Sequence, residues 1–313
     1  MMFAGAMLAA LLIEAGVGWP DALFDRIGHP VTWIGALIDA CDQRYNRESD
    51  SDLIRQSNGI IMVFGIVVAV WLATALVIWL IPQGWARGVF TGILAWPLVA
   101  GRSLHDHVKA VALPLAQGDL STAREAVALI VGRDPDRLDS AGVARAALES
   151  LGESASDGVV APLFWGVIFG LPGIAAYKAI NTMDSMIGHL SPRHAAFGWA
   201  AARLDDLVNL IPARLTGLLF AAISGCWKQS VAVMLRDAGK HRSPNAGWPE
   251  AALAGALAVR LSGPRVYENR LSPEPWVNDG APDPTPMDLG HGLHLYLRLL
   301  LALAGILALL AVI

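Results

Sequence analysis

A continuous apolar run over residues 59–81 is the feature that most restricts how this chain can fold. About 20 apolar residues in an α-helix cross the hydrocarbon core of a bilayer, and only a helix or a closed barrel pairs every backbone polar group there. Further apolar segments, some interrupted by proline, glycine or arginine, cover residues 3–17, 89–104, 159–180, 210–227 and 293–313. The sequence therefore predicts an all-α polytopic membrane protein with about five spanning or re-entrant helical segments.

Composition supports a membrane protein and argues against several other classes. Hydrophobic residues make up 55% of the chain and charged residues 16%, whereas soluble domains carry about 25% charged residues. The net charge of -4 gives no indication of nucleic-acid binding. Cys41 and Cys226 lack the spacing of a zinc site or a disulfide framework. Residues 3–17 follow no basic segment, so they are interpreted as a retained helix, in which Glu14 is a functional candidate.

Polar stretches interrupt what we expect to be a single membrane-embedded domain over residues 1–313. Residues 105–157 are predicted to form a polar helical insert, and the proline-rich residues 272–286 a linker without packed structure. The Gly-Leu-Pro-Gly sequence at 170–173 breaks the apolar segment 159–180. This break favours a re-entrant hairpin over a kinked span, and a hairpin would return Asp157 and Asp184 to the same side of the membrane.

Three carboxylates recur at four-residue intervals on a helix that is predicted to begin at Asp139 or Ser140 and to end at Gly158. They are Glu149, Glu153 and Asp157. At about 100° per residue they share an arc of roughly 80°, where like charges repel. A cation would remove that repulsion, and Mg²⁺ prefers carboxylate oxygens. The alternative is a solvated face in which a carboxylate pairs with the arginine one turn earlier.

A second polar group precedes and opens a predicted helix over residues 249–261. Lys240 and Arg242 stand before Pro249, which suits the first position of a helix, and Ser243 and Asn245 lie between them. Free N–H groups at a helix start favour an anion. The segment therefore predicts a phosphate or carboxylate seat. The alternative is a basic juxtamembrane loop that contacts anionic lipid.

Two more polar groups occupy predicted helices on either side of residue 190. They are Lys178, Asn181 and Asp184 at steps of three, and Arg203, Asp205, Asp206 and Asn209 within two turns. A structural alternative exists for each group, because lysines near a membrane edge are commonly interfacial anchors and Arg203 can pair with Asp206.

The chemistry that these groups suggest is phosphoryl transfer with Mg²⁺. A metal neutralises phosphate oxygens, and arginine or lysine stabilises the charge that develops on transfer. The sequence has no P-loop, dinucleotide fingerprint, nucleophile elbow or zinc-protease motif. A transporter would place its charges within the spans, whereas most charges here lie outside them.

Several short words of this sequence, taken in order, resemble one family. They are His29-Pro30-Val31 with Ile34-Gly35, Gly118-Asp119-Leu120, Gly132-Arg133-Asp134, Glu149-Ser150, Asp157 to Phe164, Asn181 to Met186, Arg203 to Asp206, Asn209 to Arg214, and Lys240 to Glu250. Over about residues 10–268 the chain resembles the CobD/CbiB family, the membrane-bound adenosylcobinamide-phosphate synthases of cobalamin biosynthesis.

The resemblance implies an ATP-dependent ligase that joins the propionate carboxyl of adenosylcobyric acid to aminopropanol or its phosphate, with Mg²⁺. Two departures from the family pattern stand out. Trp19 replaces the aspartate of a Gly-Asp-Pro word that follows the acidic residue matching Glu14. Gly152-Glu153-Ser154 replaces Ala-Glu-Asn.

With the resemblance in place, each group receives a role. Metal binding is expected of Glu149, Glu153, Asp157 and Asp205; phosphate or substrate binding of Arg133, Arg203, Lys240, Arg242, Ser243 and Asn245; and catalysis of Asp184, Asp206 and Lys178. We expect all of them at one water-facing pocket on the inner surface of the bilayer.

The expected partners are the corrinoid, the amine, ATP and membrane lipid, with other enzymes of the pathway as possible associates, and no nucleic acid. The expected location is the cell inner membrane, with the active site facing the cytoplasm. Two other classes remain open: a corrinoid or solute transporter, and a non-catalytic membrane scaffold.

Overall fold

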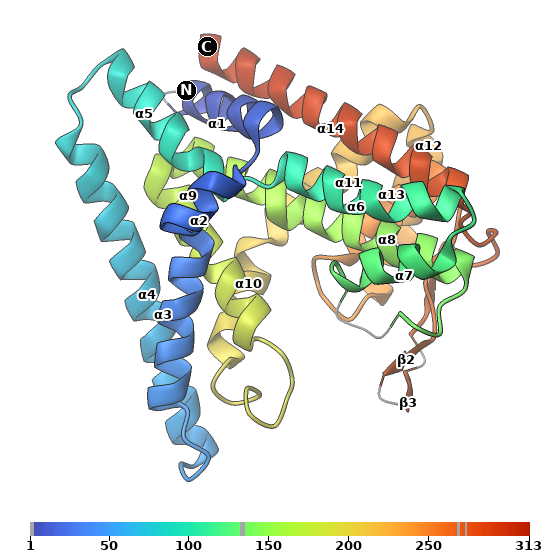
Figure 1. The fold of residues 1–313 in the computed structure, drawn as a ribbon, viewed down its shortest axis with the longest axis horizontal. Helices are drawn as coiled ribbons and strands as arrows, with labels where there is room; N and C mark the ends of the chain where they lie inside the picture. The colour runs from blue at the N-terminus through green and yellow to red at the C-terminus, as the bar shows by residue number, and fades with distance from the viewer. Residues whose placement is uncertain (1–2, 132–134, 268–269, 273) are drawn as a thin grey trace. The chain divides into compact units, whose positions relative to one another are not determined.

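The computed structural model describes residues 3–131, 135–267, 270–272 and 274–313, with side chains described outside 265–272. The chain forms two compact units (Figure 1). Unit 1 comprises residues 1–100, 161–209 and 306–313, and unit 2 comprises residues 101–160 and 210–305. Nearly all regular structure is helical, which confirms the all-α prediction.

Unit 1 is built from helices of two separate stretches of the chain, residues 1–100 and 161–209, together with the last residues of α14. In chain order they are α1 (Ala4–Val17), α2 (Asp21–Ile27), α3 (Pro30–Tyr45), α4 (Asp52–Leu80), α5 (Trp85–Ala95), the 3₁₀ turn η1 (Trp96–Leu98), α9 (Ala161–Ile187) and α10 (Trp199–Val208).

A shared core holds α3, α4, α9 and α10 together. Ile38 of α3, Met62 of α4, Met183 of α9 and Ala201 of α10 are among its buried members. The chain enters α3 through a capping box, in which His29 Nδ1 accepts a hydrogen bond from the N–H of Val31 at 3.2 Å. Proline at the first helical position lacks an N–H that would have no partner there. Together the capping box and Pro30 fix the start of α3.

The predicted break in the apolar segment 159–180 is also present. Gly170 has φ 68° and ψ -148°, a conformation that favours glycine, and it divides α9 into two arms. A Cβ added to Gly173 would clash with the carbonyl oxygen of Trp165. Trp165 and Gly173 are eight residues apart, and in a straight helix such residues are separated by about 12 Å. Because they are in contact here, the second arm turns back toward the first. The break is confirmed, and the choice between a hairpin and a kinked span stays a prediction, because Ser140–Ile187 is also long and apolar enough to cross a membrane.

Unit 2 contains the remaining helices and all the strands among the described residues. In chain order it holds α6 (Gly101–Ala116), α7 (Leu120–Ala128), α8 (Ser140–Ala155), the π-helical turn η2 (Ser156–Val160), α11 (Leu210–Ser224), α12 (Trp227–Asp237), the 3₁₀ turn η3 (Ala238–Lys240), α13 (Gly247–Leu257), β1 (Leu261–Ser262), β2 (Arg265–Tyr267), β3 (Arg270–Ser272), β4 (Trp276–Val277) and α14 (Pro286–Val312), whose last residues belong to unit 1.

Aspartate side chains cap two helices of the polar insert, and α8 begins where the sequence predicts. Asp119 caps α7 by accepting from the N–H of Thr122, and Asp139 caps α8 by accepting from the N–H of Gly142. Gly158 does not end α8 as expected, because the chain continues through the π-turn η2. The strands pair as β1 with β4 and β2 with β3, both antiparallel.

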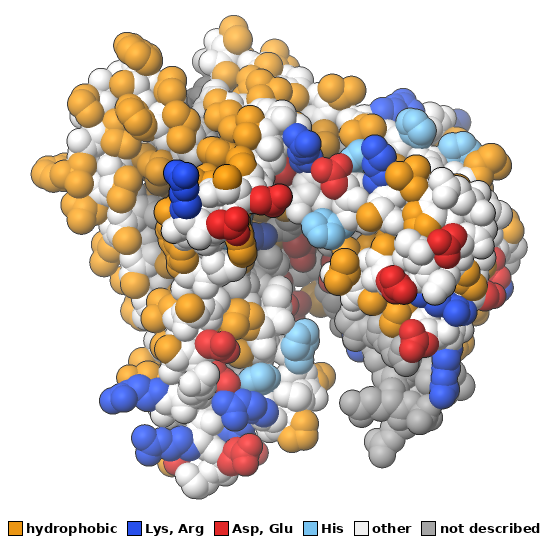
Figure 2. Space-filling view, in the orientation of Figure 1, with side chains coloured by type: hydrophobic (Ala, Val, Ile, Leu, Met, Phe, Trp, Pro, Cys, Tyr) orange, Lys and Arg blue, Asp and Glu red, His pale blue; other side chains and the backbone are white. Residues whose placement is uncertain are grey.

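Within the described residues, three helices are long and apolar enough to cross a membrane: Asp52–Leu80, Ser140–Ile187 and Pro286–Val312. Two pairs of helices, bent by 110° and 47°, bring the count to as many as five if each pair forms one span. Figure 2 shows hydrophobic side chains over the α4 and α5 part of unit 1, and Ile61 and Trp79 of α4 are 69% and 72% exposed. The expected weak span over 89–104 is wrong, because Pro97 lies in a 3₁₀ turn that separates α5 from α6.

The expected unpacked linker at 272–286 is wrong for its described residues. Trp276 of β4 pairs with β1, and the guanidinium groups of Arg145 and Arg260 both lie over its ring, at 4.7 and 4.2 Å from the ring centroid. Asp283 accepts two hydrogen bonds from Arg260, at 2.9 and 2.6 Å, and another from Arg145. Prolines prevent helix here but leave side chains available to pack.

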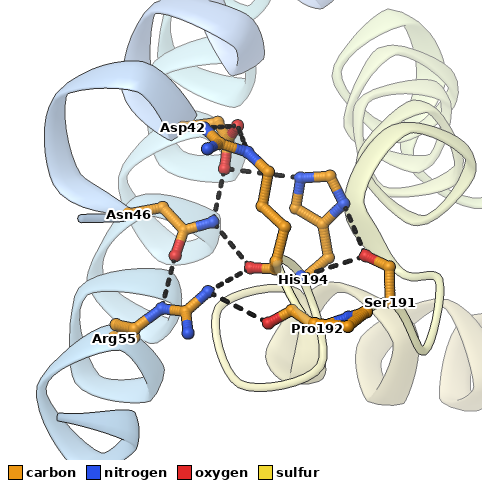
Figure 3. Close-up of polar contacts among 7 residues, drawn as sticks. Asp42, Asn46, Arg55, Ser191, Pro192 and His194 are labelled. Atoms are coloured by element: carbon orange, nitrogen blue, oxygen red, sulfur yellow. Dashed lines mark hydrogen bonds and ion pairs between the residues drawn. The ribbon is translucent and has the colours of Figure 1, made fainter. Parts of the chain in front are cut away.

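A polar clasp in unit 1 joins α3 and α4 to the loop between α9 and α10 (Figure 3). Arg193 of the loop donates to Asp42 Oδ2 at 2.6 Å, and His194 Nε2 lies 3.5 Å from Asp42 Oδ1. Asn46 donates to Asp42 Oδ1 at 2.7 Å and to the Arg193 carbonyl at 2.9 Å. Arg55 of α4 donates to Asn46 Oδ1 at 2.8 Å. The clasp fixes the loop that leads into α10.

Close contact between α4 and the same loop yields a stability prediction. A Cβ on Gly59 would lie 2.9 Å from the carbonyl carbon of Phe197 and would clash with its oxygen. Gly59→Ala should therefore lower the free energy of unfolding by about 1–3 kcal/mol, the usual cost of overpacking. Gly65→Ala on the same helix is the control, because nothing lies within 4 Å of its Cβ. Thermal denaturation in detergent compares the two, and equal melting temperatures would contradict the packing argument.

Candidate functional site

The polar groups predicted on α9 and α10 come together in unit 1. Lys178 and Asp184 lie on α9, and Arg203, Asp205 and Asp206 lie on α10. The two helices pack against each other, with Met183 and Ala201 in their shared core. These five residues come from two separate segments of the sequence and lie in one cluster, which we call the α9–α10 cluster.

Asp205 is the most deeply buried of these carboxylates, and amide groups hold it. Its side chain accepts a hydrogen bond from Asn209 Nδ2 at 2.9 Å on Oδ2, and one from Asn181 Nδ2 at 3.5 Å on Oδ1. Asn181 Oδ1 in turn accepts from Lys178 Nζ at 3.5 Å. Asn209 Oδ1 accepts from the hydroxyl of Tyr177 at 2.9 Å.

Three carboxylates of the cluster interact electrostatically. Asp184 is repelled by Asp206, and Asp205 is repelled by both. Arg203 offsets part of this charge through an ion pair with Asp206 at 3.3 Å, although the Arg203 side chain is 66% exposed. Lys178 interacts electrostatically with His29 as well. The cluster concentrates negative charge beside one lysine, an arrangement that favours a bound cation.

The three carboxylates predicted on α8 have different surroundings within unit 2. Glu149 is 6% exposed, and its Oε1 accepts a hydrogen bond from the backbone N–H of Ser262 at 2.7 Å. It therefore faces β1 and not water, which corrects the expectation of a single solvent-facing acidic stripe. Glu153 is exposed and Asp157 is half-buried. Over residues 3–131, 135–267, 270–272 and 274–313, no group of three or more acidic, histidine or cysteine side chains is arranged to hold a metal ion.

Glu149 and Glu153 should therefore respond differently to substitution. Glu149→Ala removes the acceptor for the buried Ser262 N–H and should lower the free energy of unfolding by about 1–3 kcal/mol. Glu153→Ala should leave the melting temperature within the scatter of wild type, because Glu153 is exposed. Melting curves in detergent make the comparison, and equal losses would show that the hydrogen bond to β1 contributes little.

Lys240, predicted to bind phosphate, is held by a buried carboxylate. Asp237 is fully buried and accepts from Lys240 Nζ at 2.8 Å, from Arg236 Nη2 at 2.6 Å and from the Asn278 N–H at 2.7 Å. Burial by itself would raise the pKa of Asp237, but hydrogen bonds from Arg236, Lys240 and Asn278 outweigh it and hold that pKa well below its usual range.

The rest of the 240–250 segment forms a tight turn into α13. Ser243 Oγ accepts from the N–H groups of Asn245 and Ala246, at 3.2 and 3.3 Å. Arg214 donates to Asn245 Oδ1 at 3.5 Å and lies 4.4 Å from the ring centroid of Trp248. The predicted helix start at Pro249 is wrong by two residues, because the turn lets α13 begin at Gly247.

Other residues of this segment differ in exposure. Arg242 is 71% exposed and lies 4.0 Å from Glu274. Glu250 is 2% exposed and lies 3.6 Å from His241 Nε2. Arg133, also expected to bind phosphate, lies outside the described residues. Arg242 is therefore the cation of this turn that is most open to a ligand.

Trp19 occupies the place where the family pattern has an acidic residue. Its ring lies edge-on to His29 at 4.9 Å and packs on Trp96 at 5.4 Å between centroids. Trp96 Nε1 donates to the carbonyl of Gly18 at 2.9 Å. In this chain the position fills an aromatic cluster at the end of α1. Glu14, predicted as functional, is 3% exposed in α1.

Sequence reasoning missed Tyr177 and the structural role of Asp237. Tyr177 and Asn181 are four residues apart and share a helix face, so their spacing could have added Tyr177 to the cluster. The run Arg236-Asp237 with Lys240 also has helical spacing. No local signal indicated that Asn278 would join it, because that residue is 41 positions away along the chain.

The fold and the α9–α10 cluster define a polytopic helical membrane protein with a charged site built from two packed helices. Residues 7–296 match the family described as CobD/Cbib protein, so the chain belongs to the CobD/CbiB family. It is similar to the Cobalamin biosynthesis protein CobD of Rhodobacter capsulatus, with 59% identity over 313 residues that cover 100% of this chain and 98% of that protein.

More distant relatives carry the same description. The Cobalamin biosynthesis protein CobD of Brucella suis is 47% identical over 86% of this chain and 84% of its own length. That of a Sinorhizobium species is 45% identical over 95% of this chain and 94% of its own. No solved structure matches the chain.

Proposed function

We propose that this chain acts in cobalamin biosynthesis as an ATP-dependent amide ligase. The reaction would join the propionate carboxyl of adenosylcobyric acid to aminopropanol or aminopropanol phosphate. Membership of the CobD/CbiB family supports the pathway. The observation that carries the chemistry is the α9–α10 cluster, where a lysine and three mutually interacting carboxylates lie on two packed helices.

Mg²⁺ is compatible with the donors of this cluster. Magnesium sites use one or two carboxylates together with substrate phosphates and waters, so a cage of three protein ligands is not required. Asp205, fixed by two amide groups, and Asp184 would hold the ion. Bound Mg²⁺ would neutralise phosphate oxygens of ATP. The family-based assignment of Glu153 and Asp157 to metal binding remains a proposal for unit 2.

The protein side chains would supply orientation and proton transfer. In the first step a carboxylate oxygen of the corrinoid attacks the γ-phosphorus, which forms an acyl phosphate and releases ADP. In the second step the amine nitrogen attacks the carbonyl carbon, phosphate leaves and the nitrogen loses a proton. Asp206 or Asp184 would accept that proton, and Lys178 would stabilise the charge on the transferring phosphoryl group.

Arg242 is our first choice for anion binding in unit 2, followed by Arg203 in unit 1. Arg242 is largely exposed and its carboxylate contact is long, at 4.0 Å. Lys240 would have to give up its ion pair with buried Asp237 to bind phosphate, so we rank it lower. Ser243 and Asn245 would shape the turn. Because ATP is a cytoplasmic substrate, the site is proposed to face the cytoplasm from the inner membrane.

Purified protein in detergent tests this function directly. We expect an amide product, identified by mass spectrometry, only when the corrinoid, the amine, ATP and Mg²⁺ are all present. ADP should be released in a one-to-one ratio with product. Comparing free and phosphorylated aminopropanol identifies the amine. Corrinoid uptake into vesicles without amide formation would instead favour the transporter, and inactivity on every combination would favour the scaffold.

A further inference from the structure

A chain of buried hydrogen bonds in unit 1 ends on one oxygen of Asp205. Tyr177 is 2% exposed, Asn209 1% and Asp205 8%. The Tyr177 hydroxyl donates to Asn209 Oδ1, and Asn209 Nδ2 donates to Asp205 Oδ2, both at 2.9 Å. These partners fix the amide of Asn209, because its oxygen must face the hydroxyl donor and its nitrogen must face the carboxylate.

The other oxygen of Asp205 points to the remaining polar groups of the cluster. Oδ1 accepts from Asn181 Nδ2, and Asn181 accepts from Lys178. The terminal torsion of an aspartate is broad, so a carboxylate without a partner on Oδ2 could rotate. Repulsion from Asp184 and Asp206 acts on Asp205 and would promote that rotation.

We propose that Tyr177 and Asn209 are positioning residues that anchor Asp205 Oδ2 and so present Oδ1 to a divalent cation. This inference rests on the proposed function, because it assumes that the α9–α10 cluster holds a cation. Neither residue touches the reacting atoms. Tyr177 acts through Asn209, and Asn209 acts through Asp205.

The proposal can be tested without turnover by titrating Mn²⁺ alone into the detergent-solubilised protein. The electron paramagnetic resonance signal of the free ion then gives the affinity for Mn²⁺. Partners behind a metal ligand affect metal affinity about 10–100-fold. Asn209→Ala should weaken Mn²⁺ binding about 10-fold, and Tyr177→Phe should weaken it about threefold, as expected for one lost hydrogen bond. Both variants should also need more Mg²⁺ for half-maximal amide formation.

Trp165→Phe is the matched control. It removes a hydrogen bond of similar type between the same two helices, from Trp165 Nε1 to the Val208 carbonyl at 3.1 Å, without touching the Asp205 chain. Its Mn²⁺ affinity should equal that of wild type. An equal loss of affinity in Trp165→Phe would overturn the proposal, since the effect would then be general loosening of α9 against α10.

The remaining outcomes also decide the matter. Wild-type Mn²⁺ affinity in Tyr177→Phe and Asn209→Ala would overturn the proposal while leaving the ligase function intact. If Asn209→Ala fails to fold, Tyr177→Phe decides alone, since it removes a single oxygen atom. Weakened Mn²⁺ binding in a protein that forms no amide would support the positioning role and refute the proposed function. No Mn²⁺ binding by wild type would overturn the positioning role, and the amide-formation assay would then decide the proposed function by itself.

Discussion

Asp184→Asn should lower the rate of ATP-dependent amide formation by at least about 100-fold, the lower range for the loss of a group that transfers protons. Asp184 lies on α9 within the α9–α10 cluster and interacts electrostatically with Asp206. The asparagine has almost the same shape but carries no charge, so it cannot accept a proton from the amine or help to hold a cation. Initial rates at saturating ATP and corrinoid measure the effect.

Asp39→Asn is the control for Asp184→Asn. Asp39 is exposed on α3 of the same unit, so Asp39→Asn makes the same chemical change at a position outside the cluster. The control should retain the wild-type rate, and both variants should have similar melting temperatures. If Asp184→Asn retained most of the wild-type rate, Asp184 would be neither the proton acceptor nor a ligand of the cation, and Asp206 would be the remaining candidate for the proton acceptor.

Asp237→Ala should lower the free energy of unfolding by about 2–3 kcal/mol. Hydrogen bonds to a charged group contribute about 1.5–3 kcal/mol each, and partial exposure of Arg236 and Lys240 reduces their share. The Asn278 N–H is buried and would lose its acceptor, Asp237 Oδ2. Melting temperatures in detergent measure the loss. Asp279→Ala is the control, because Asp279 is exposed and follows Asn278 in the chain; it should change the melting temperature little.

The same residue predicts how stability depends on pH. The pKa of Asp237 is lower in the folded protein than in the unfolded chain, so its contribution is fully present above the ordinary aspartate pKa of about 3.9. The contribution should be lost as the pH falls below about 4 and approaches the folded pKa. Asp237→Asn should show a flatter loss over that range. Parallel curves for wild type and Asp237→Asn would refute the linkage.

Local patterns fix where several helices begin or break because the causes are local. Pro30 at the first position of α3, the aspartate caps of α7 and α8 and the glycine break in α9 each depend on a few adjacent residues. The strands were not predicted. β1 and β4 have two residues each, too few for a recognisable alternation, and their paired residues are 14 and 16 positions apart. The 89–104 segment was assigned by hydropathy, although Pro97 could not continue the helix.

The candidate site was predicted in part, and the errors have a common cause. Helical spacing grouped Asp205 with Asn209, which the structure joins by a hydrogen bond, but it also grouped Glu149 with Glu153. Spacing gives the direction of a side chain on its helix and not what covers it. Glu149 accepts a hydrogen bond from the backbone N–H of Ser262, which lies 113 positions away along the chain.

The sequence by itself determined that the chain is a helical membrane protein and which family it belongs to. It also determined where capped helices such as α8 begin. Those properties depend on composition, near-neighbour spacing and short words in order. Only the tertiary structure decided that Asp205 is held by Asn209 and Tyr177, that Lys240 pairs with a buried aspartate and that the proline-rich segment packs. Burial and ion pairing join residues far apart in the chain, and no local pattern encodes those contacts.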